Sequence, residues 1–493
     1  MDIMKKTASA ALCAVMISAA LLSCGGTDKP AAAGTAAGTA SPGADQETAA
    51  AAGLAGSVTP EISKELGLDG YDFKIYLREK SYEWSNWDLD TDELNGEALN
   101  DAVYSRNLKL QETFGFNIET LSSGSVNMDD VSTMLLAGDD TYDSIFPQMR
   151  CATSLAQKGL LLDLRSLKYL DFASDSWSSM YNDTLSMMNR LFYATGDISL
   201  NYRASLFMII FNKAMLSSYA LDDPYGLVRD GKWTLDAIES MSLAAAADID
   251  GDSKMTKSDQ WGLVFQESES GVIFYYGSGE RVVALDSDNR PFISLGGDRS
   301  TAVYDRIVKM MGEKDAIKTM SDADTGTTFR DGRALFLATV VFHLKTMRST
   351  ETDFGVLPVP KYDEPQENYI QFADGWCISP ACVPVTAKNP ETSGFIFILQ
   401  AIAEASRDEV IPAYYDICLS EKYARDQESV EMLDIIFKNC LLENSDNFQW
   451  AGFDGAFKKA FIKGDPLQSL LEKYRSKLET AIEATVAAFE ENT

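Results

Sequence analysis

The feature that most constrains the fold is an alternation of strand and helix patterns near the start of the folded chain. The patterns follow one another at 71–78, 96–115, 116–121, 129–140 and 142–147, the first, third and fifth being strands. Gly115 stands where the first helix should end. Because parallel strands are joined by helical crossovers, this order predicts a parallel α/β sheet.

Similar patterns continue along the rest of the chain. Residues 205–216 read as a strand running into a helix, 234–247 as a helix capped by Thr234, and 466–491 as a long closing helix. More than 400 residues follow Leu68 without a second apolar stretch of membrane-spanning length. That length is too great for one hydrophobic core, so two lobes are expected.

The first residues read as an export signal. Lys5 and Lys6 precede the apolar run 11–22, which is short for a membrane span. Ser23 and Cys24 then resemble the lipobox of bacterial lipoproteins, so residues 1–23 are expected to be a signal peptide and Cys24 the lipidated residue. A plain signal peptide with an incidental cysteine is the alternative. The Ala, Gly and Thr-rich residues 24–67 are expected to form a flexible tether.

The charge of the chain narrows its partners. It carries 74 acidic and 43 basic residues, a net charge of −31. Nucleic acid and anionic lipid are therefore poor candidates, and contact with the membrane is expected only through the N-terminal lipid. Most of the acidic residues should form a solvated surface.

Cysteine and histidine give little sign of catalysis. Cys377 with Cys382 and Cys418 with Cys440 are conceivable disulfides, but buried free thiols are equally compatible with the sequence. The single histidine, His343, lies in an apolar stretch and is expected to be a packed or cleft-edge residue. No nucleophile elbow, phosphate loop or dinucleotide fingerprint is present. Paired carboxylates of a glycoside hydrolase remain an alternative, since a chain this acidic brings some pair close.

Short motifs in a fixed order give the chain a family resemblance. They are "LLAGDDTYDSIF", "KGLLLDLRSL", "FNKAMLSSYAL", "GKWTLDAIESMS", "FRDGRALFL", "DFGVLPVPKYD", "GWCISPA" and "TAKNPETSGFIFIL". Together they resemble the extracellular solute-binding proteins of carbohydrate ABC importers, the maltose-binding-like group. The resemblance implies a periplasmic-binding-protein-like α/β fold of type II, with two lobes that are discontinuous in sequence and joined by a hinge.

The resemblance also implies an arrangement of the lobes. The N-terminal lobe would comprise 68–202 plus 375–412 and the C-terminal lobe 203–374 plus 413–493, with crossings near 199–203, 372–376 and 411–416. Phe342 and His343 stand where the family often has tryptophan, so the sugar can differ.

The function that the resemblance implies is binding without catalysis. The chain would be a monomer that captures a carbohydrate, such as an oligosaccharide, between its lobes and delivers it to ABC permease subunits. It would be exported and held at the cell membrane by its lipid, facing the periplasm or cell exterior. An exported carbohydrate-active enzyme or a sugar-sensing surface lectin of the same fold are the alternatives.

The sequence also contains candidate sugar-binding residues. A pyranose offers an apolar C–H face and a rim of hydroxyls, so its site needs aromatic platforms with amides or carboxylates. After the first strand these are supplied by Tyr82, Glu83, Trp84, Asn86, Trp87 and Asp88. Trp376 and Trp450 are further candidates, whereas Trp233 and Trp261 are expected to pack internally. Packing of Trp84 and Trp87 inside the lobe is the alternative.

Residues 247–262 resemble a calcium loop. Asp248, Asp250, Asp252 and Asp259 occupy positions 1, 3, 5 and 12, and Lys254 would contribute its carbonyl oxygen. Ser253 replaces the usual glycine and Asp259 the usual Glu. Sensors usually pair two such loops, so a single structural Ca²⁺ site is expected, with an ion-free acidic turn as the alternative.

Overall fold

The computed structural model describes residues 58–80, 85, 88–269, 271–347, 350–388, 394–419 and 426–491. The predicted signal peptide and Cys24 lie outside the described residues, as do Tyr82, Glu83, Trp84, Asn86 and Trp87. Among the described helices, none combines the length and apolar character needed to cross a bilayer.

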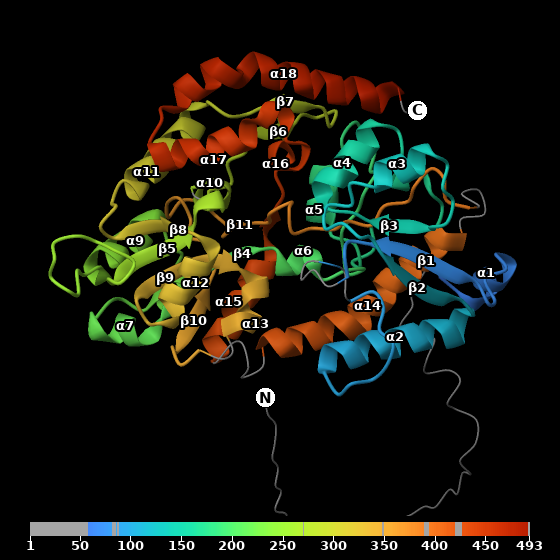
Figure 1. Cartoon of the computed structure of the whole chain (residues 1–493), viewed down its shortest axis with the longest axis horizontal. Helices are drawn as coiled ribbons and strands as arrows, with labels where there is room; N and C mark the ends of the chain where they lie inside the picture. The colour runs from blue at the N-terminus through green and yellow to red at the C-terminus, as the bar shows by residue number, and fades with distance from the viewer. Residues whose placement is uncertain are drawn as a thin grey trace, which may run out of the picture. The chain divides into compact units, whose positions relative to one another are not determined.

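The first lobe is built on a three-stranded parallel sheet of order β2-β1-β3 (Figure 1). Its strands are β1 (Asp72–Leu77), β2 (Asn117–Ser122) and β3 (Ser144–Phe146). The strand patterns of the sequence are thus confirmed. Asp72 is paired with Asn117, and Ile75 with Ser144.

Helices complete the first lobe. They are α2 (Ala98–Phe114), α3 (Val131–Leu136), α4 (Met149–Gln157), the 3-10 turn η1 (Leu164–Ser166) and α5 (Ser179–Leu185). Gly115 ends α2 with φ of 85°, as predicted, and its N–H donates to the carbonyl of Gln111. The conformation favours glycine, because other residues pay a steric cost at positive φ.

Ordered structure begins before the predicted end of the tether at residue 67. Helix α1 (Pro60–Glu65) starts at Thr59, whose hydroxyl accepts the N–H of Ile62. Val58 is 2% exposed, and the buried hydroxyl of Ser63 donates to the carbonyl of Phe114. These contacts fix residues that composition alone assigns to the tether.

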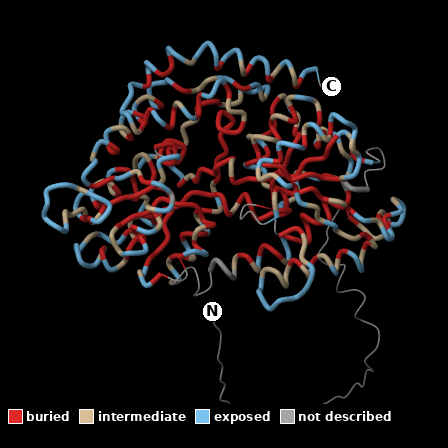
Figure 2. The backbone as a smooth tube through the Cα atoms, in the orientation of Figure 1, coloured by how far each residue is buried: buried red, intermediate tan, exposed pale blue. Residues whose placement is uncertain are grey.

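The second lobe contains a five-stranded mixed sheet of order β10-β4-β9-β5-β8. Its strands are β4 (Phe207–Asn212), β5 (Trp261–Gln266), β8 (Ile317–Met320), β9 (Ala334–Val340) and β10 (Phe354–Leu357). Strand β5 is parallel to β8 and β9, whereas β4 is antiparallel to β9 and β10. Every residue of β4 and β9 is buried (Figure 2), as expected for central strands covered on both faces.

Helices and 3-10 turns surround this sheet. They are α7 (Lys213–Ser218), α8 (Pro224–Arg229), α9 (Leu235–Ala245), η2 (Glu267–Glu269), α10 (Val272–Gly277), α11 (Asp298–Met311), α12 (Asp322–Arg330), η3 (Val341–His343) and α13 (Leu344–Met347). A hairpin of β6 (Val283–Leu285) and β7 (Pro291–Ile293) lies beside them. Thr234 caps α9 by accepting the N–H of Ala237, as predicted.

The remaining elements join or overlie the two lobes. They are α6 (Asn201–Ala204), β11 (Gln371–Phe372), α14 (Gly394–Leu419), α15 (Gln427–Lys438), β12 (Cys440–Leu441), α16 (Asn444–Phe448), η4 (Trp450–Gly452), α17 (Phe453–Lys463) and α18 (Leu467–Glu491). Helix α14 packs along α2 (Figure 1) and contains Pro412, after which Tyr415 contacts Phe437 of α15. The chain thus passes from one lobe to the other along this helix.

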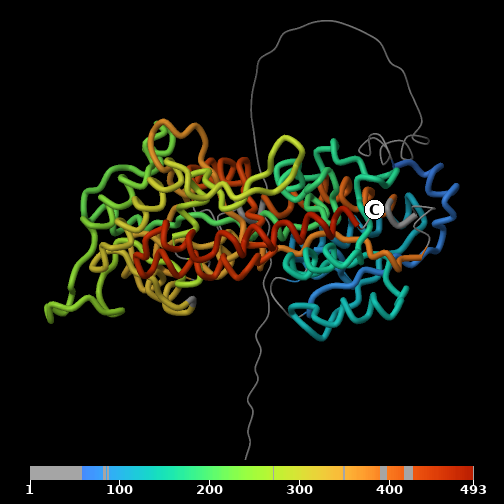
Figure 3. The backbone as a smooth tube through the Cα atoms, turned by 90° about the horizontal axis from the view of Figure 1, so that it is seen from above, coloured from blue at the N-terminus to red at the C-terminus, as the bar shows by residue number. Residues whose placement is uncertain are grey.

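The long helix α18 contacts both lobes. Near its start Leu471 lies against Gly296 of the second lobe. Near its end Thr485 accepts a hydrogen bond from Gln157 of α4, and Phe489 packs edge-on against Phe192. Seen from above in Figure 3, the helix runs as one continuous segment that ends beside the C-terminus. The C-terminal segment therefore ties α4 of the first lobe to the second lobe.

The positions of the tryptophans and cysteines test the expected packing of Trp233 and Trp261 and the conceivable disulfides. Trp233 and Trp261 are fully buried, and their indole N–H groups donate to the carbonyls of Pro358 and Thr256, which confirms the predicted packing role. Free thiols are found at Cys151, Cys377, Cys382 and Cys440. In this structure neither proposed disulfide is formed, because Cys377, Cys382 and Cys440 are all unpaired.

Candidate functional site

Three strand ends meet at one edge of the second lobe. Strands β5 and β9 are parallel, with Phe265 opposite Ala338. Leu206, just before β4, bridges antiparallel to Ala373, and β4 itself is antiparallel to β9. The chain after β11 therefore runs in the same direction as β9. Since parallel strands end at the same edge, the residues following β5, β9 and β11 lie along one edge, where α/β proteins commonly bind ligands.

Trp376 lies at this edge, three residues after Ala373. The Asp374 carboxylate accepts its backbone N–H at 2.9 Å, and the Asp446 carboxylate accepts the N–H of Gly375 at 3.1 Å. A Cβ atom at residue 375 would collide with the side-chain oxygen of Asn447, so only glycine fits there. The Trp376 side chain is half-buried, which leaves part of its surface accessible.

Two guanidinium groups of the first lobe lie beside the Trp376 ring. The Cζ atoms of Arg78, just after β1, and of Arg150 in α4 are each 5.8 Å from a ring centroid. Arg78 is fully buried, and it donates to the carbonyls of Val126 at 2.9 Å and of Trp376 at 3.2 Å. Such cation–π contacts orient the ring and join it to the first lobe.

A buried ionic cluster surrounds Lys458 of α17. Its Nζ atom is 3.1 Å from Glu269, 3.2 Å from Asp454 and 3.5 Å from Asp446. The Asp446 carboxylate also lies 2.8 Å from Arg150. Buried charges persist only when they are paired in this way. The cluster joins η2, α16 and α17 to α4 of the first lobe.

The carboxyl groups of this cluster have divergent pKa values. Burial, followed by the negative charge of Asp446, raises the pKa of Asp454 to about 7. Burial and the nearby Asp374 also raise the pKa of Glu269. Burial acts in the same direction on Asp446, but Lys458 and Arg150 outweigh it and lower the pKa of that carboxyl. The site therefore offers protonated and ionised carboxyl groups together near neutral pH.

Several polar atoms around the cluster have no hydrogen-bond partner among the described residues. They are Nε2 of Gln148, Nε of Arg150, both side-chain amide atoms of Asn447 and Oδ1 of Asp454. Buried polar atoms are normally paired, by protein or by ordered water. Ordered water can therefore pair with these buried atoms.

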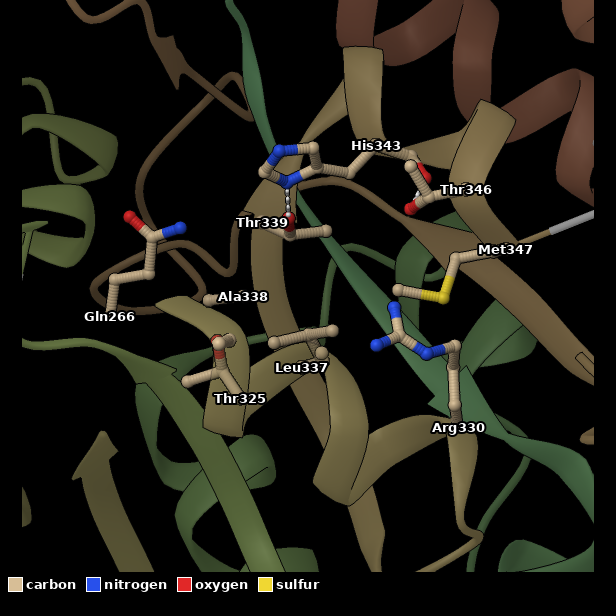
Figure 4. Close-up of a pocket in the computed structure, with 11 residues that line it drawn as sticks. Gln266, Thr325, Arg330, Leu337, Ala338, Thr339, His343, Thr346 and Met347 are labelled. Carbon is tan, nitrogen blue, oxygen red and sulfur yellow. Dashed lines mark hydrogen bonds between the residues drawn. The ribbon is translucent and has the colours of Figure 1, made fainter. Parts of the chain in front are cut away.

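A pocket of about 180 Å³ lies at the ends of β5 and β9 (Figure 4). Residues from β5, α12, β9, η3 and α13 contribute the labelled side chains of Gln266, Thr325, Arg330, Leu337, Ala338, Thr339, His343, Thr346 and Met347. The Thr339 hydroxyl and Nδ1 of His343 are 2.9 Å apart. His343 is thus at a pocket edge, one of the two positions expected for it.

The other predicted binding residues within the described chain are buried. The Asp88 carboxylate accepts the N–H of Leu200 at 2.6 Å and lies 3.3 Å from the Ser199 hydroxyl, so it holds the backbone just before α6. Trp450 is 3% exposed, stacks on Phe448 and donates its indole N–H to Thr485. In this conformation both side chains are used internally, and their contact with ligand stays a prediction.

The calcium-like loop brings three of its carboxylates together. Asp248, Asp250 and Asp252 each offer an oxygen within 4.8 Å of the others. The N–H of Asp252 lowers the pKa of Asp250, but desolvation and the neighbouring carboxylates outweigh it, so the pKa of Asp250 is raised. Ser253 adopts a positive φ of 65°, the conformation for which glycine is usual.

Asp259 is placed differently from the three clustered carboxylates. It is buried and accepts the N–H groups of Ile249 and Thr256. These bonds, the one from Thr256 foremost, lower the pKa of its carboxyl. Three of the predicted ligands are therefore preassembled, whereas Asp259 closes the loop through backbone contacts.

The sequence analysis did not identify the ionic cluster. Glu269, Asp374, Asp446 and Lys458 come from four separate segments, and their local surroundings resemble those of the many surface charges. The one available signal is the short spacing of Asp454 and Lys458, which places both on the same face of α17.

Comparison with known proteins gives the fold. No family model matches the sequence, and no curated protein matches it. Many solved structures are similar to this chain, and the following three match it over most of its length. An ABC substrate-binding protein from Listeria monocytogenes in complex with cycloalternan is 15% identical with a TM-score of 0.53, and the match covers 84% of this chain and 99% of that one.

The other two structures give the same picture. A sugar transporter from Rhizobium etli in an open conformation is 13% identical with a TM-score of 0.55, covering 85% of this chain and 99% of that one. A cyclo/maltodextrin-binding protein complexed with maltotetraose is 12% identical with a TM-score of 0.54, covering 86% and 97%. The chain therefore has the two-lobed α/β fold of the type II periplasmic binding proteins, with lobes discontinuous in sequence.

Proposed function

We propose that this protein captures a carbohydrate in the form of an oligosaccharide. The oligosaccharide would bind between the lobes at Trp376 and be delivered to an ABC permease. The observation that carries the proposal is the half-buried Trp376 ring at a lobe crossing, beside Arg78 and Arg150 of the first lobe. Two of the similar structures contain cycloalternan and maltotetraose, which supports a carbohydrate as the ligand class.

The chemistry of the site suits a sugar. The indole ring is a platform for the C–H face of a pyranose. Beside it, the partly exposed guanidinium of Arg150 offers hydrogen-bond donors to the hydroxyl rim, and the buried Asp446 carboxylate holds that guanidinium in place. Because these groups come from both lobes, a bound sugar would contact each lobe and stabilise the closed arrangement. Binding then acts by population shift, and no bond of the ligand is broken.

The proposal includes the location and partners of the protein. The sequence supports export and lipidation at Cys24, so that the protein is held at the membrane as a monomer near the permease subunits. The clustered Asp248, Asp250 and Asp252 support a structural Ca²⁺ ion in the second lobe. Lys254 and Asp259 complete the proposed ligand set.

One observation favours an enzyme as the alternative. The pKa of Asp454 is raised by burial while that of Asp446 is lowered by Lys458 and Arg150. Two carboxyl groups with separated pKa values are the pattern of an acid and a base in glycoside hydrolysis. In the receptor, the same buried groups hold Arg150 and Lys458 in place.

The test is a thermal-shift screen of the full chain against neutral and acidic oligosaccharides, followed by calorimetry of each stabilising sugar. A receptor is expected to show saturable binding, compaction in solution scattering and release of chemically unchanged ligand after long incubation. Cleaved sugar that disappears with Asp454→Asn would establish the enzyme instead. Absence of binding to every saccharide would reject the carbohydrate receptor.

A further inference from the structure

We propose that the pocket in Figure 4, which we call the Arg330 pocket, binds an anionic group of the carbohydrate. The substrates would then be acidic oligosaccharides that carry a carboxylate or a sulfate ester. This inference rests on the proposed carbohydrate-binding function and narrows its substrate class.

The composition of the Arg330 pocket favours an anion. Its polar side chains are those of Gln266, Thr325, Arg330, Thr339, His343 and Thr346. None of the lining residues is Asp or Glu, in a chain with 74 acidic residues and a net charge of −31. The polar groups are a guanidinium, the single imidazole of the chain, hydroxyls and an amide, all able to donate hydrogen bonds to an anion. A site of this kind contrasts with the acidic surface around it.

Arg330 is available to a ligand. It is exposed, and its Nη2 atom donates to the Thr327 hydroxyl at 3.2 Å within the same helix. Within the part of the chain that the structure describes, no carboxylate forms an ion pair with it, whereas nearby Arg333 is paired with Asp331 at 2.7 Å. A guanidinium binds carboxylate or sulfate oxygens through two parallel N–H groups, a geometry that a sugar hydroxyl does not match.

The local backbone leaves room for this guanidinium. A Cβ atom added to Gly326 would lie 3.2 Å from Nη1 of Arg330, so a larger residue would press on the group. Lys345, two residues after His343, is not part of the lining, and its Nζ atom lies 3.3 Å from the ring centroid of Phe342. The charge that attracts an anion to the pocket is therefore that of Arg330, and this attraction is strongest at low ionic strength.

Part of the lining of the Arg330 pocket lies at the sheet edge that carries Trp376. Arg330 itself ends α12 just before β9 begins, and its guanidinium lies back along the helix beside Gly326. Gln266 ends β5, and the next three residues form η2, which ends at Glu269 beside Lys458. His343 follows β9, and Trp376 follows β11, at the same edge of the sheet. A chain of sugar units that begins on Trp376 would have to extend from this edge past Gln266, Thr339 and His343 to place an anionic group against Arg330.

The test is calorimetry of the full chain with matched pairs of ligands. Oligogalacturonates are compared with their carboxyl-reduced, neutral forms, and sulfated disaccharides with their desulfated forms. We expect at least tenfold tighter binding of the charged member in one pair, with an affinity that falls as salt rises. The pair that shows the preference identifies carboxylate or sulfate as the recognised group.

Two variants test whether Arg330 is responsible for the preference for the charged ligand. Arg330→Gln is expected to weaken binding of the acidic ligand at least tenfold and to leave binding of its neutral form unchanged. Arg407→Gln, an exposed arginine paired with Asp175 in the first lobe, removes the same charge elsewhere and serves as the control. The melting temperature of each variant checks that it is folded.

The remaining outcomes distinguish failure of the anionic pocket from failure of the carbohydrate receptor. Equal binding of charged and neutral forms, or an acid preference that survives Arg330→Gln, overturns the anionic pocket while the carbohydrate receptor stands. Absence of binding to all four ligand types, when the wider sugar screen is also negative, rejects the receptor and the pocket with it.

Discussion

The Asp446 carboxylate of α16 lies 2.8 Å from the Arg150 guanidinium of α4 and joins two segments almost 300 residues apart. The same carboxylate accepts the N–H of Gly375, next to Trp376. One side chain thereby holds the C-terminal segment, the first lobe and the chain crossing at Trp376 together. This relationship predicts that stability and binding depend jointly on Asp446.

Asp446→Ala is expected to lower the free energy of unfolding by about 3 kcal/mol, because Arg150 and Lys458 would lose a buried anionic partner. Urea unfolding measures the change. Glu479→Ala is the control, since that residue forms an exposed pair with Arg475 and should change stability by less than about 1 kcal/mol. Equal effects of the two substitutions would contradict the role assigned to Asp446.

Stability should also depend on pH through Asp454. Its pKa rises from the ordinary range to about 7 on folding, so the folded state holds a proton that the unfolded state releases. Stability is therefore lost as the pH rises from the ordinary aspartate pKa of about 4 to the folded-state pKa of about 7, and the loss ends above about pH 7. Between pH 6 and 8 the free energy of unfolding should fall by about 1 kcal/mol because of this group.

Asp454→Asn removes the titrating group and should flatten that pH dependence. Denaturant unfolding at pH 6, 7 and 8 makes the comparison. Asp465→Asn, a substitution in the exposed turn after α17, is the control and should retain the wild-type slope. A variant at residue 454 with the full wild-type slope would show that another group is responsible.

The local fold was predictable because its signals are local. Gly115 ends α2 and Thr234 begins α9 where the sequence places them, since a positive φ and an N-cap each depend on one residue. The boundary at residue 67 was wrong, because Ser63 is fixed by its bond to Phe114, which lies 51 residues away. Composition carries no information about such a contact.

The site was predictable only in part, for the same reason. Trp376 was a candidate because the family resemblance implies a crossing near 372–376, and its contact with ligand stays a prediction. The grouping of Glu269, Asp446 and Lys458 depends on how η2, α16 and α17 pack. In a chain with many charged residues, nothing in the sequence distinguishes these three from those at the surface.

Calcium should stabilise the protein through the loop at 248–259. Binding to the folded state alone adds about 2.7 kcal/mol when free Ca²⁺ is 100 times its dissociation constant. Asp250→Ala combined with Asp252→Ala should abolish the rise in melting temperature, because two of the three clustered carboxylates are lost. The exposed pair Asp222→Ala and Asp230→Ala is the control. An identical response of both double variants to calcium and chelator would exclude a specific ion in this loop.

Lipidation at Cys24 makes a cellular prediction. With the native export machinery, the wild-type chain should incorporate labelled palmitate and remain with membranes, since several acyl chains anchor a protein stably. Cys24→Ala should lose both properties. Cys13→Ala, within the apolar run that precedes the expected cleavage point, is the control. Palmitate labelling that survives Cys24→Ala would show that Cys24 is not the lipidated residue.

Two of the tryptophans predicted to bind ligand, Trp376 and Trp450, should respond differently to substitution. Trp376 is half-buried beside two cationic side chains, and Trp376→Ala should weaken binding of any sugar by about 1 to 3 kcal/mol through the lost stacking platform. Trp450 is almost fully buried against Phe448 and bonded to Thr485. Trp450→Phe should therefore lower the melting temperature and leave the affinity of the folded protein nearly unchanged.

Calorimetry and thermal unfolding of both tryptophan variants separate the two roles. Ligand-induced quenching of tryptophan fluorescence should diminish with Trp376→Ala and persist with Trp450→Phe, because among the tryptophans that the structure describes Trp376 is the one that is not buried. If Trp450→Phe abolishes binding in a protein that is still folded, then Trp450 must leave its packed position when the lobes close around the ligand. If Trp376→Ala binds as tightly as wild type, the sugar does not lie at this crossing, and the binding site has to be sought elsewhere along the sheet edge.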